Sequence, residues 1–520
     1  MIVTSPFPKV TLSNLTATER VFAGVNPDAT VLIDGVTGTS LTGAAFVAAV
    51  KSLAGGLTQK GYAPGGCVAL MAPNMPEYCV VFHGVAWAGG TVTPINPTYT
   101  APEVNHQLID AGAELLVTVP AFADVARQAI KGTNVREIVV IGDAPSGTTP
   151  LATLMGTPLQ HQAAVDVVNH VVALPYSSGT TGLPKGVMLT HQNLVVNIDQ
   201  CLEATQQVPG ETTVAFLPFF HIYGLQVLMN INLSGAGCTV TVPRFDLEQF
   251  LTLCTKHKTR RLWIVPPVAL ALAKHPMVDA FDLSFIEQIN SAAAPLGADV
   301  AQAMGTRLGT NATQGYGMTE LSPVSHISRP GFAVAGASGR TLPNTECRIV
   351  DPETLIDLPI GQDGELWVKG PQVMKGYLNN PTATAATIVQ DGWLRTGDIA
   401  HFDAEGYLFV TDRLKELIKV KGFQVAPAEL EALLLTHPDI QDAAVIGIPD
   451  DGAGEVPMAF ITAASPPTLE DIRTFLEPQV AHYKHIQKLE IIPEIPKSTS
   501  GKILRRELRD QVKARARDQQ

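Results

Sequence analysis

The segment of the chain richest in phosphate-binding residue types is YSSGTTGLPKG, which runs from Tyr176 to Gly186. Its glycines let backbone N–H groups turn towards an anion, and its hydroxyls and lysine add charge-assisted hydrogen bonds. The pattern differs from a P-loop, because Lys185 is followed by Gly186 rather than by serine or threonine. It therefore predicts a triphosphate-binding loop of another kind, formed by Ser177, Ser178, Gly179, Thr180, Thr181, Gly182 and Lys185.

Two acidic residues close separate motifs that suit a nucleotide and its metal ion. Glu320 ends the string QGYGMTE, directly after Thr319. A carboxylate next to a hydroxyl offers the hard oxygen ligands that Mg²⁺ prefers. Asp398 ends the string GWLRTGD, and a carboxylate can accept several hydrogen bonds at once. Either motif alone is typical of an ordinary turn, but together with the Gly-rich segment they favour a site for ATP and Mg²⁺.

Lys502 is a third residue whose local sequence suits phosphate chemistry. It lies in the string PKSTSGK, where Gly501 gives the backbone room to enter a cleft. Phosphoryl transfer builds up charge on the phosphoryl oxygens, and a lysine in a dry, preorganised site stabilises that charge. The last 24 residues of the chain are basic, and a lysine in such a tail is otherwise a solvated charge. We expect this segment to be exposed and the Lys502 side chain to matter little for folding.

The first 150 residues must supply a scaffold, and their pattern alternates between strands and helices. Thr42 can cap a helix that runs to about Gln59. Alternation of this kind predicts a parallel sheet with helices on its faces. We expect strands at 67–71, 91–94, 115–119 and 137–141, and helices at 76–88 and 101–111.

The pattern changes twice in the second half of the chain. From about residue 360 the strands are short and close together, which predicts a β-rich subdomain. A second shift near Asp412 precedes a helix expected over 425–435, with Pro427 in its first turn. The predicted fold class is α/β, with a large N-terminal domain of layered α/β sheets plus the β-rich subdomain over 1–411, and a small α+β C-terminal domain over 412–520.

Composition and charge exclude several classes of protein. The chain has 520 residues, of which 46% are hydrophobic and 16% charged, so it is not disordered. Its net charge of −12 argues against a nucleic-acid partner. The most apolar stretch, around 79–92, is too short to span a bilayer, and six scattered cysteines are typical of reduced thiols. We expect a cytoplasmic protein, a monomer or a homodimer, with small-molecule partners.

The motifs together resemble the acyl-adenylate-forming superfamily, which includes acyl-CoA ligases, beetle luciferases and the adenylation domains of peptide synthetases. The matching strings occur in the family's order, and they are YSSGTTGLPKG, LPFFHIYG, QGYGMTE, GWLRTGD, DRLKELIKVKGFQ and PKSTSGK. The chain is most similar to 4-coumarate–CoA ligases, through FFHIYGL, SAAAPLG, YGMTEL and KVKGFQVAPAELE. The resemblance implies an AMP-forming ligase that uses ATP and Mg²⁺ to join a carboxylic acid to CoA through an acyl-adenylate.

The resemblance also implies roles for individual residues in the first half-reaction. Lys502 would be catalytic and Glu320 would hold the metal ion. His221 lies among aromatic residues and is by itself typical of a packed side chain, but the resemblance places it in the acyl tunnel near the carboxylate. Besides the phosphate-binding loop, the implied nucleotide contacts are Gln314, Gly315, Tyr316 and Thr319, with Asp398 and Arg413 as the ribose ligands.

A second set of residues is implied for the transfer to CoA. Adenylation makes AMP the leaving group, so that a thiol can attack the acyl carbon. In the family the residue at the position of Lys415 is a hinge, about which a mobile C-terminal domain presents two faces to one site. Lys421 and Gly422 then resemble the loop that faces CoA. Lys419 and Gln424 resemble polar residues that support the reaction centre.

The acyl pocket that the resemblance implies combines small residues with one tyrosine. By resemblance it is lined by Ile222, Tyr223, Val227, Ala293, Gly315, Gly317, Pro323 and Val324. The ring and hydroxyl of Tyr223 favour a hydroxycinnamate-like acid of the 4-coumarate type. A medium-chain fatty acid could occupy the same groove. The same motifs are also compatible with a luciferase-like oxygenase, with an enzyme that loads a carrier protein and with an ATP-binding protein that has no activity.

Overall fold

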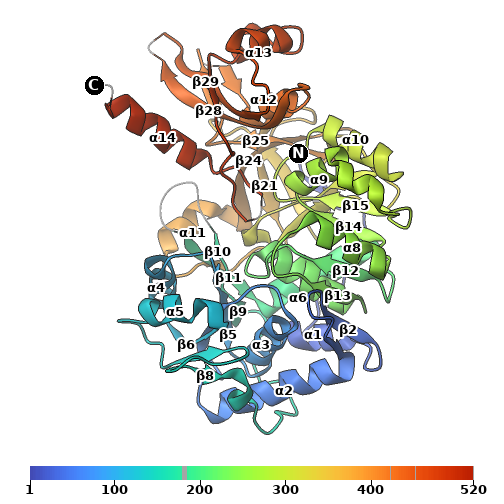
Figure 1. Ribbon diagram of the computed structural model, residues 1–520, viewed down its shortest axis with the longest axis vertical. Helices are drawn as coiled ribbons and strands as arrows, with labels where there is room; N and C mark the ends of the chain where they lie inside the picture. Colours follow the sequence, from blue (N-terminus) through green and yellow to red (C-terminus); the bar gives the residue numbers. More distant parts are fainter. Residues whose placement is uncertain (178–183, 422, 451, 500, 519–520) are drawn as a thin grey trace.

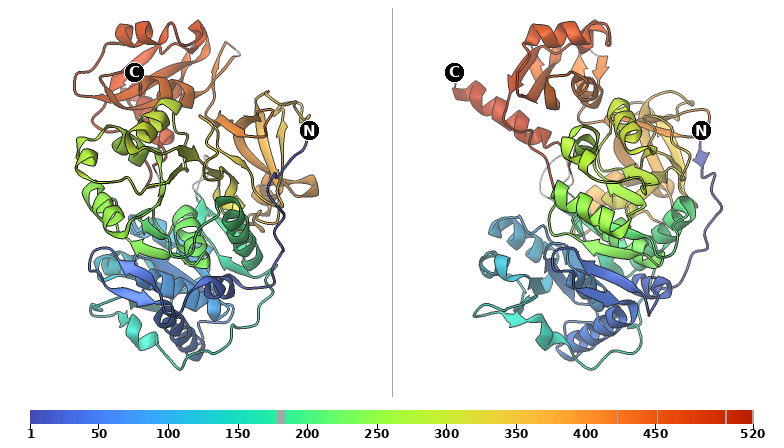
Figure 2. Two further views of the ribbon diagram at one scale, coloured as in Figure 1. Left: turned by 90° about the vertical axis from the view of Figure 1, so that its right-hand side faces the viewer. Right: turned by 45° about the vertical axis from the view of Figure 1, so that its right-hand side comes forward.

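The computed structural model describes residues 1–177, 184–421, 423–450, 452–499 and 501–518, with side chains as far as 515. A large body runs from the N-terminus to about residue 413, and a smaller module formed by the rest of the chain lies at one end of it (Figure 1). Figure 2 shows that the β-rich part of the body and the N-terminus lie together near the module. The site described below lies where the body and the module meet.

The first sheet of the body is mainly parallel and has helices on both faces. Its strands are β4 (Cys67–Met71), β5 (Thr91–Pro94), β6 (Ala113–Thr118), β7 (Glu137–Val140), β8 (Thr149–Pro150), β9 (Val171–Ala173), β10 (Tyr176–Ser177), β11 (Lys185–Thr190) and β22 (Gly376–Tyr377). The order is β10-β11-β9-β5-β4-β6-β7-β8, with β22 beside β11. The helices are α2 (Gly43–Gln59), α3 (Pro76–Trp87), α4 (Ala101–Asp110) and α5 (Ala123–Ala129).

Side chains of β4 alternate between the two faces of this sheet, as a strand requires. Val68 and Leu70 join the core that contains α2 and α3, whereas Ala69 and Met71 join the core of α4 and α5. A strand that is buried on both faces reads as a continuous apolar run, which is why the sequence revealed it. The expected strands and helices of this region are confirmed to within two residues, and Thr42 accepts a hydrogen bond from the Ala45 N–H at the start of α2.

Two further sheets complete the layered part of the body. The first runs β12 (Thr212–Ala215), β13 (Cys238–Thr241), β2 (Thr30–Asp34) and β3 (Ser40–Thr42), and the second runs β14 (Arg261–Ile264), β15 (Gln288–Ser291) and β16 (Ala312–Gln314). Their helices are α1 (Ala17–Gly24), α6 (His191–Thr205), α7 (Asn232–Ser234), α8 (Leu247–His257), α9 (Pro266–Lys274) and α10 (Ala298–Leu308). A π-helical segment, Tyr223–Ile231, precedes α7.

The β-rich subdomain is confirmed as an antiparallel sheet. Its strands are β1 (Val3–Thr4), β20 (Glu346–Val350), β21 (Gly364–Lys369), β23 (Ile388–Val389), β24 (Trp393–Phe402) and β25 (Leu408–Arg413). A small sheet of β17 (Tyr316–Gly317), β18 (Val324–Ile327) and β19 (Arg340–Thr341) lies between this subdomain and the layered sheets in the chain order, and α11 (Pro381–Thr387) precedes β23. Single-turn 3₁₀ helices span Pro120–Phe122, Leu151–Leu154, Pro276–Ala280, Thr319–Leu321, Gln390–Gly392 and His482–Lys484.

The C-terminal module has cores of its own. Its strands are β26 (Ile418–Val420), β27 (Phe423–Val425), β28 (Ile440–Asp450), β29 (Gly454–Ala463) and β30 (Lys488–Ile491), and its helices are α12 (Pro427–Leu434), α13 (Leu469–Leu476) and α14 (Arg505–Asp518). The buried residues of the two clusters that hold it together all lie between Ile418 and Leu508. The module therefore packs as an α+β unit.

The join between body and module is a turn after β25. This strand pairs with β24 as far as Arg413, so sheet pairing continues two residues beyond the expected boundary at 411. Lys415 is exposed in the turn, and the Leu414 N–H donates to the Gly397 carbonyl at 2.8 Å. The division into two domains and the hinge stay predictions.

All six cysteines are buried and none forms a disulfide. Within the described residues, no helix is long and apolar enough to cross a membrane.

Candidate active site

A cavity opens where the module meets the body, and it unites the residues expected for the acyl pocket. All eight of them line it, namely Ile222, Tyr223, Val227, Ala293, Gly315, Gly317, Pro323 and Val324. The sequence did not reveal the other lining residues Trp263, Asn290, Ala292, Met318 and Ile327. Each of these is next to or within a motif or apolar strand, so only the fold distinguishes them from core residues.

Two glycines give this cavity a wall made of backbone. A Cβ atom at Gly317 would lie 2.2 Å from the Pro323 carbonyl oxygen, and one at Gly315 would lie 3.2 Å from Asn290 Oδ1. A side chain at Gly317 is therefore excluded, and one at Gly315 would crowd the cavity.

Lys502 reaches this cavity from the module. Residues 496–499 and 501–504 pair as the two arms of a hairpin: the Ser498 N–H donates to the Lys502 carbonyl at 2.8 Å, and the Leu504 N–H donates to the Pro496 carbonyl at 2.8 Å. Gly501 takes a φ of +80° near its tip. A Cβ at Gly501 would lie 3.1 Å from Pro267, so this tip rests on the body. The expectation that the segment is exposed is therefore wrong: the Lys502 side chain is half-buried and lines the cavity.

The surroundings of Lys502 weaken its hold on a proton. Burial and then the positive charge of Arg413 lower the pKa of this amine to about 8, while Asp398 and Glu320 oppose the shift. A cation that is partly desolvated gains more from a nearby anion than a solvated one does. The site is therefore suited to a negatively charged ligand such as a phosphate.

His221 lines the same cavity as a neutral imidazole. Burial, and then the charge of Lys502, lower the pKa of this side chain to about 3. The Tyr223 N–H donates to its Nδ1 atom at 3.2 Å. The hydrogen of the neutral ring is thus on Nε2, which can donate to a carboxylate or carbonyl oxygen. This geometry supports a binding role for His221 rather than proton transfer.

Asp398 and its partners form the site expected for ribose. The Tyr316 hydroxyl donates to Asp398 Oδ2 at 2.6 Å, and Arg413 Nε lies 3.4 Å from Oδ1. Asp398 and Arg413 are direct neighbours on β24 and β25. Burial and then the Asp398 charge raise the pKa of the Tyr316 hydroxyl well above its usual value, so it stays a donor. The structure thus brings three of the predicted nucleotide contacts together.

Glu320 lies beside Ser177, the first residue of the predicted phosphate-binding loop, and is almost fully buried. Ser177 Oγ donates to its Oε1 atom at 3.1 Å, and the Tyr377 hydroxyl donates to the same atom at 2.8 Å. Lys185 Nζ lies 4.8 Å from the centre of the Tyr377 ring. Tyr377 was not predicted, because nothing in its local sequence shows that β22 pairs with β11.

The oxygen atoms of Glu320 and Thr319 are suitable ligands for Mg²⁺. No bond to Glu320 Oε2 comes from the described residues, and Thr319, its neighbour in the chain, lines the cavity. Within the described part of the chain, no group of three or more His, Cys, Asp and Glu side chains could hold a metal alone. One carboxylate with phosphate and water ligands is how proteins commonly bind this ion.

Several predicted residues are not brought to the cavity. The Leu296 N–H donates to Gln314 Oε1 at 2.9 Å, and Gln314 Nε2 donates to the Leu296 carbonyl at 3.1 Å. This side chain therefore supports a neighbouring loop instead. The residues Ser178, Gly179, Thr180, Thr181, Gly182 and Gly422 lie outside the described residues.

The residues expected for CoA transfer lie on another face of the module. Lys419 and Gln424 are opposite each other in the β26–β27 hairpin, and both are exposed. Lys421 is exposed at the turn of this hairpin, with a φ of +50°. None of the three lines the cavity that contains Lys502.

Two known families match the chain. The AMP-binding enzyme family matches residues 20–378, and the AMP-binding enzyme C-terminal domain matches residues 429–502. The chain therefore belongs to the AMP-binding enzyme family, which confirms the resemblance drawn from the motifs and the expectation that this protein is an enzyme.

Among curated proteins, the chain is similar to 4-coumarate–CoA ligases of plants. The chain is 42% identical over 505 residues to 4-coumarate–CoA ligase 1 of Petroselinum crispum, and the match covers 93% of this chain and 91% of that protein. It is 41% identical over 503 residues to 4-coumarate–CoA ligase 5 of Oryza sativa subsp. japonica, with 94% and 92% covered.

Among solved structures, the anthranilate CoA ligase AuaEII in complex with anthranoyl-AMP is similar with a TM-score of 0.89 at 26% identity, covering 96% of this chain and 98% of that one. ATP-bound MatB from Rhodopseudomonas palustris gives 0.86 at 29% identity, with 96% and 99% covered. These structures confirm the α/β fold class with a large N-terminal and a small C-terminal part.

Proposed function

We propose that this protein is an AMP-forming acid–CoA ligase that activates a hydroxycinnamate-like acid with ATP and transfers it to CoA. The observation that carries the proposal is the position of Lys502. It meets His221 in a cavity lined by the acyl-pocket residues, within reach of the charges of Arg413, Asp398 and Glu320. The relatives named above are ligases of this type.

In the first half-reaction, a carboxylate oxygen of the acid attacks the α-phosphorus of ATP, and the bond to pyrophosphate breaks. Lys502 stabilises the charge on the phosphoryl oxygens. Asp398 and Arg413 hold the ribose, while Lys185 and the Gly-rich loop hold the phosphates. Mg²⁺ bound by Glu320 would neutralise phosphate charge in this step.

In the second half-reaction, the CoA thiol loses its proton and its sulfur attacks the acyl carbon. The bond from that carbon to the AMP oxygen then breaks. We propose that residues 412–520 turn about Lys415 between the two steps. Lys419 and Gln424 would then reach the reaction centre, and Lys421 and Gly422 would face CoA. The support for this movement is that Lys419, Lys421 and Gln424 lie outside the cavity while Lys502 occupies it.

The walls of the cavity favour an aromatic acid. The Tyr223 hydroxyl donates to the Ile264 carbonyl at 3.3 Å, and burial raises the pKa of this phenol, so it keeps its proton. Its oxygen can still accept a hydrogen bond from a substrate phenol. A medium-chain acid would meet the same apolar walls, but it would leave this acceptor without a partner.

A panel of acids tests the proposal. Purified protein with ATP, Mg²⁺ and CoA is assayed for pyrophosphate release and for thioester formation with 4-coumarate, cinnamate, octanoate and beetle luciferin. We expect 4-coumarate to give the highest kcat/KM in both assays. A preference for octanoate would favour a fatty acyl-CoA synthetase, light from luciferin would favour the oxygenase, and no turnover would favour a non-enzymatic ATP-binding protein.

A further inference from the structure

The strand that presents Asp398 is interrupted by a bulge. Glu365 of β21 is opposite Ile399 of β24, and Trp367 is opposite Arg395. Leu366, the single residue between Glu365 and Trp367 on β21, therefore faces three residues of β24, namely 396–398. Gly397 takes a φ of +71° within this bulge. Bulges of this kind re-aim side chains beside active sites, and here the re-aimed side chain is that of Asp398.

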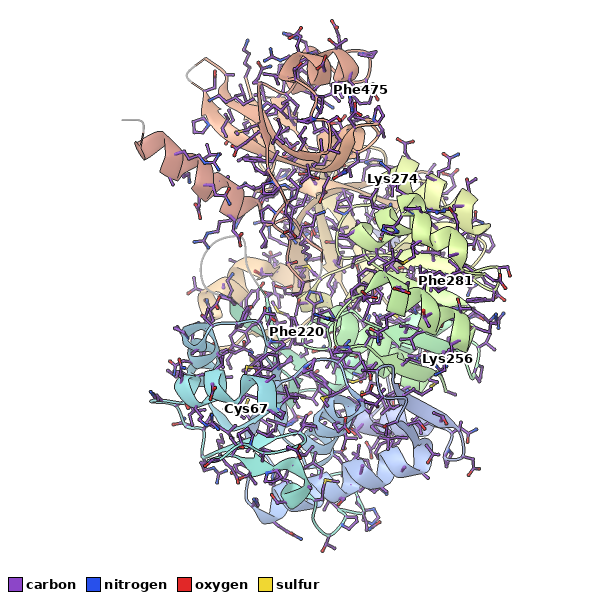
Figure 3. All side chains as sticks on the ribbon, in the orientation of Figure 1. Cys67, Phe220, Lys256, Lys274, Phe281 and Phe475 are labelled. Atoms are coloured by element: carbon purple, nitrogen blue, oxygen red, sulfur yellow. The ribbon has the colours of Figure 1, made fainter. Side chains whose placement is uncertain are left out.

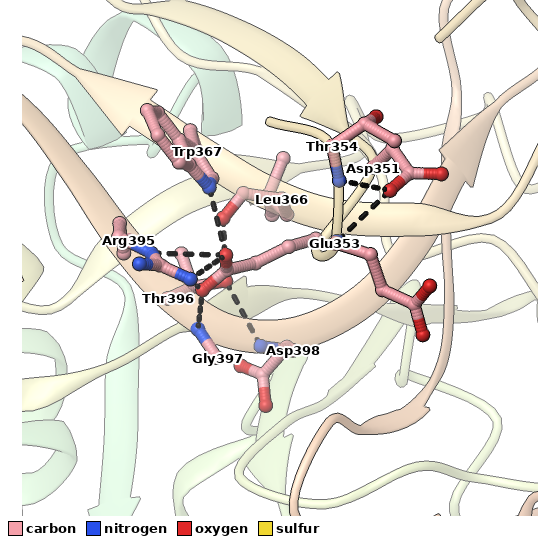
Figure 4. A network of polar contacts seen from close by, with 10 residues as sticks. Asp351, Glu353, Thr354, Leu366, Trp367, Arg395, Thr396, Gly397 and Asp398 are labelled. Atoms are coloured by element: carbon pink, nitrogen blue, oxygen red, sulfur yellow. Dashed lines mark hydrogen bonds and ion pairs between the residues drawn. The ribbon is translucent and has the colours of Figure 1, made fainter. Parts of the chain in front are cut away.

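The backbone groups that the bulge frees from the sheet find side-chain partners (Figure 4). The Gly397 N–H donates to Glu365 Oε1 at 3.2 Å, and the Asp398 N–H donates to Thr396 Oγ1 at 3.1 Å. The Thr396 hydroxyl in turn donates to the Leu366 carbonyl at 2.7 Å. Because an unpaired buried N–H is costly, these bonds fix the conformation of the bulge.

Glu365 is itself held rigidly. Its side chain is only 3% exposed, and its Oε2 atom accepts hydrogen bonds from Trp367 Nε1 at 2.9 Å and from Arg395 Nε and Nη2 at 3.0 Å and 2.8 Å. The other carboxylate oxygen, Oε1, accepts hydrogen bonds from the Gly397 N–H at 3.2 Å and from Arg395 Nε at 3.3 Å. A buried carboxylate with charge-assisted bonds on both sides has little freedom to move.

The bulge connects two parts of the proposed reaction. On one side Asp398 receives the Tyr316 hydroxyl at 2.6 Å and lies 3.4 Å from Arg413 Nε. On the other side the Gly397 carbonyl accepts the Leu414 N–H at 2.8 Å, next to Lys415. We propose that Glu365 is a positioning residue that sets the aim of Asp398 towards the ribose of ATP. The inference rests on the proposed function, because that function makes the ribose the ligand of Asp398.

Glu365→Gln tests this inference, with Trp367→Phe as the matched control. Glutamine has the same size but only one acceptor oxygen, so it cannot both hold the Arg395 and Trp367 donors and accept from Gly397. Phenylalanine at 367 removes one donor to Glu365 and leaves the bond to Gly397. Both variants would lower the melting temperature, but only the first would disturb the bulge.

We measure the Kd of ATP by calorimetry, and kcat and KM in the pyrophosphate assay. We expect the Kd and KM of Glu365→Gln for ATP to rise roughly tenfold, the loss of about one good hydrogen bond, while kcat at saturating ATP changes much less. Trp367→Phe should keep the wild-type Kd. Thr396→Val breaks the same bulge without touching the carboxylate, so it should reproduce the rise if Glu365→Gln folds poorly.

Wild-type ATP affinity in both Glu365→Gln and Thr396→Val would overturn the inference, as would an equal loss in Trp367→Phe. If the wild-type protein itself does not bind ATP, the proposed function fails and the inference fails with it.

Discussion

Two hairpins of the same module have opposite surroundings. The hairpin that carries Lys502 rests on the body at Gly501 and places Lys502 in the cavity, where burial lowers the pKa of this lysine to about 8. The β26–β27 hairpin is exposed, although it carries Lys419, Lys421 and Gln424. Both segments are rich in lysine, so composition does not explain the difference. Contact of the first hairpin with the body explains it.

Described residues of the body and the module contact each other at several places along the join. Lys274 Nζ, on α9, donates to the Leu435 carbonyl at 3.2 Å, and Figure 3 shows Lys274 on the side of the body that faces the module. A small cluster of Ile399, Leu417 and Ala426 joins the two parts near the turn. The module's larger cores are its own, so it could turn as a unit without being unpacked.

Lys502→Ala should produce the largest difference between the two half-reactions. Adenylation should fall by roughly 100- to 1,000-fold, the loss expected for a group that stabilises a transition-state charge. Thioester formation from supplied acyl-AMP should remain within a few-fold of wild type, because Lys502 serves only the first step. Lys513→Ala, which removes an exposed lysine of α14, is the control. Equal losses in both assays would contradict the assignment.

Lys419→Ala and Gln424→Ala should show the reverse pattern. Thioester formation from acyl-AMP should fall by roughly 10- to 100-fold, since small losses of positioning are costly in catalysis, while pyrophosphate release in the absence of CoA is retained. Lys488→Ala removes an exposed lysine from β30 of the same sheet and should affect neither step. Unchanged thioester formation would show that the exposed hairpin has no catalytic role.

The pH dependence of adenylation should report the enclosed lysine. Lys502 acts as a cation, and its pKa of about 8 in the free protein lies well below the usual value. The charged fraction, and with it kcat/KM for ATP, should therefore fall as the pH rises through 8, by up to about tenfold per pH unit. Lys502→Arg stays charged and should lack this decline. A wild-type profile that is flat to pH 10 would refute the prediction.

Tyr223→Phe should have the smallest effect. Removal of the hydroxyl leaves the Ile264 carbonyl with one partner fewer and takes away the acceptor for a substrate phenol. The preference for 4-coumarate over cinnamate should fall by about 0.5–1.5 kcal/mol, the net value of one hydrogen bond. The measurement is the ratio of the two kcat/KM values. An unchanged ratio would show that the substrate phenol does not bond to Tyr223 and binds elsewhere in the pocket.

Local patterns predicted much of this molecule. The β4 strand and the α2 helix follow from an apolar run and from Thr42 as a cap, both of which are encoded within a few residues. The burial of Lys502 could not be predicted in this way, because its neighbour Gly501 packs against Pro267, which comes from a distant part of the chain. Tyr377 and Glu365 escaped notice for the same reason, since their partners Glu320 and Gly397 are neighbours only in the fold.

A reversible crosslink tests the central claim that one module serves two steps by changing the face that it presents. A Cβ at Gly297 would lie 3.4 Å from the Ala432 Cβ, across the join between α10 and α12, and disulfides need a Cβ separation of about 3.5–4.5 Å. All six native cysteines are buried, so Gly297→Cys with Ala432→Cys offers one new pair at this join.

The measurement compares the oxidised and reduced forms of this double variant in both half-reactions. The account predicts that the oxidised form releases pyrophosphate like the reduced form but makes no thioester above background, and that a reductant restores thioester formation. Thioester formation at the wild-type rate by the fully oxidised form would contradict it, because the site would then complete both steps with Lys502 held in place.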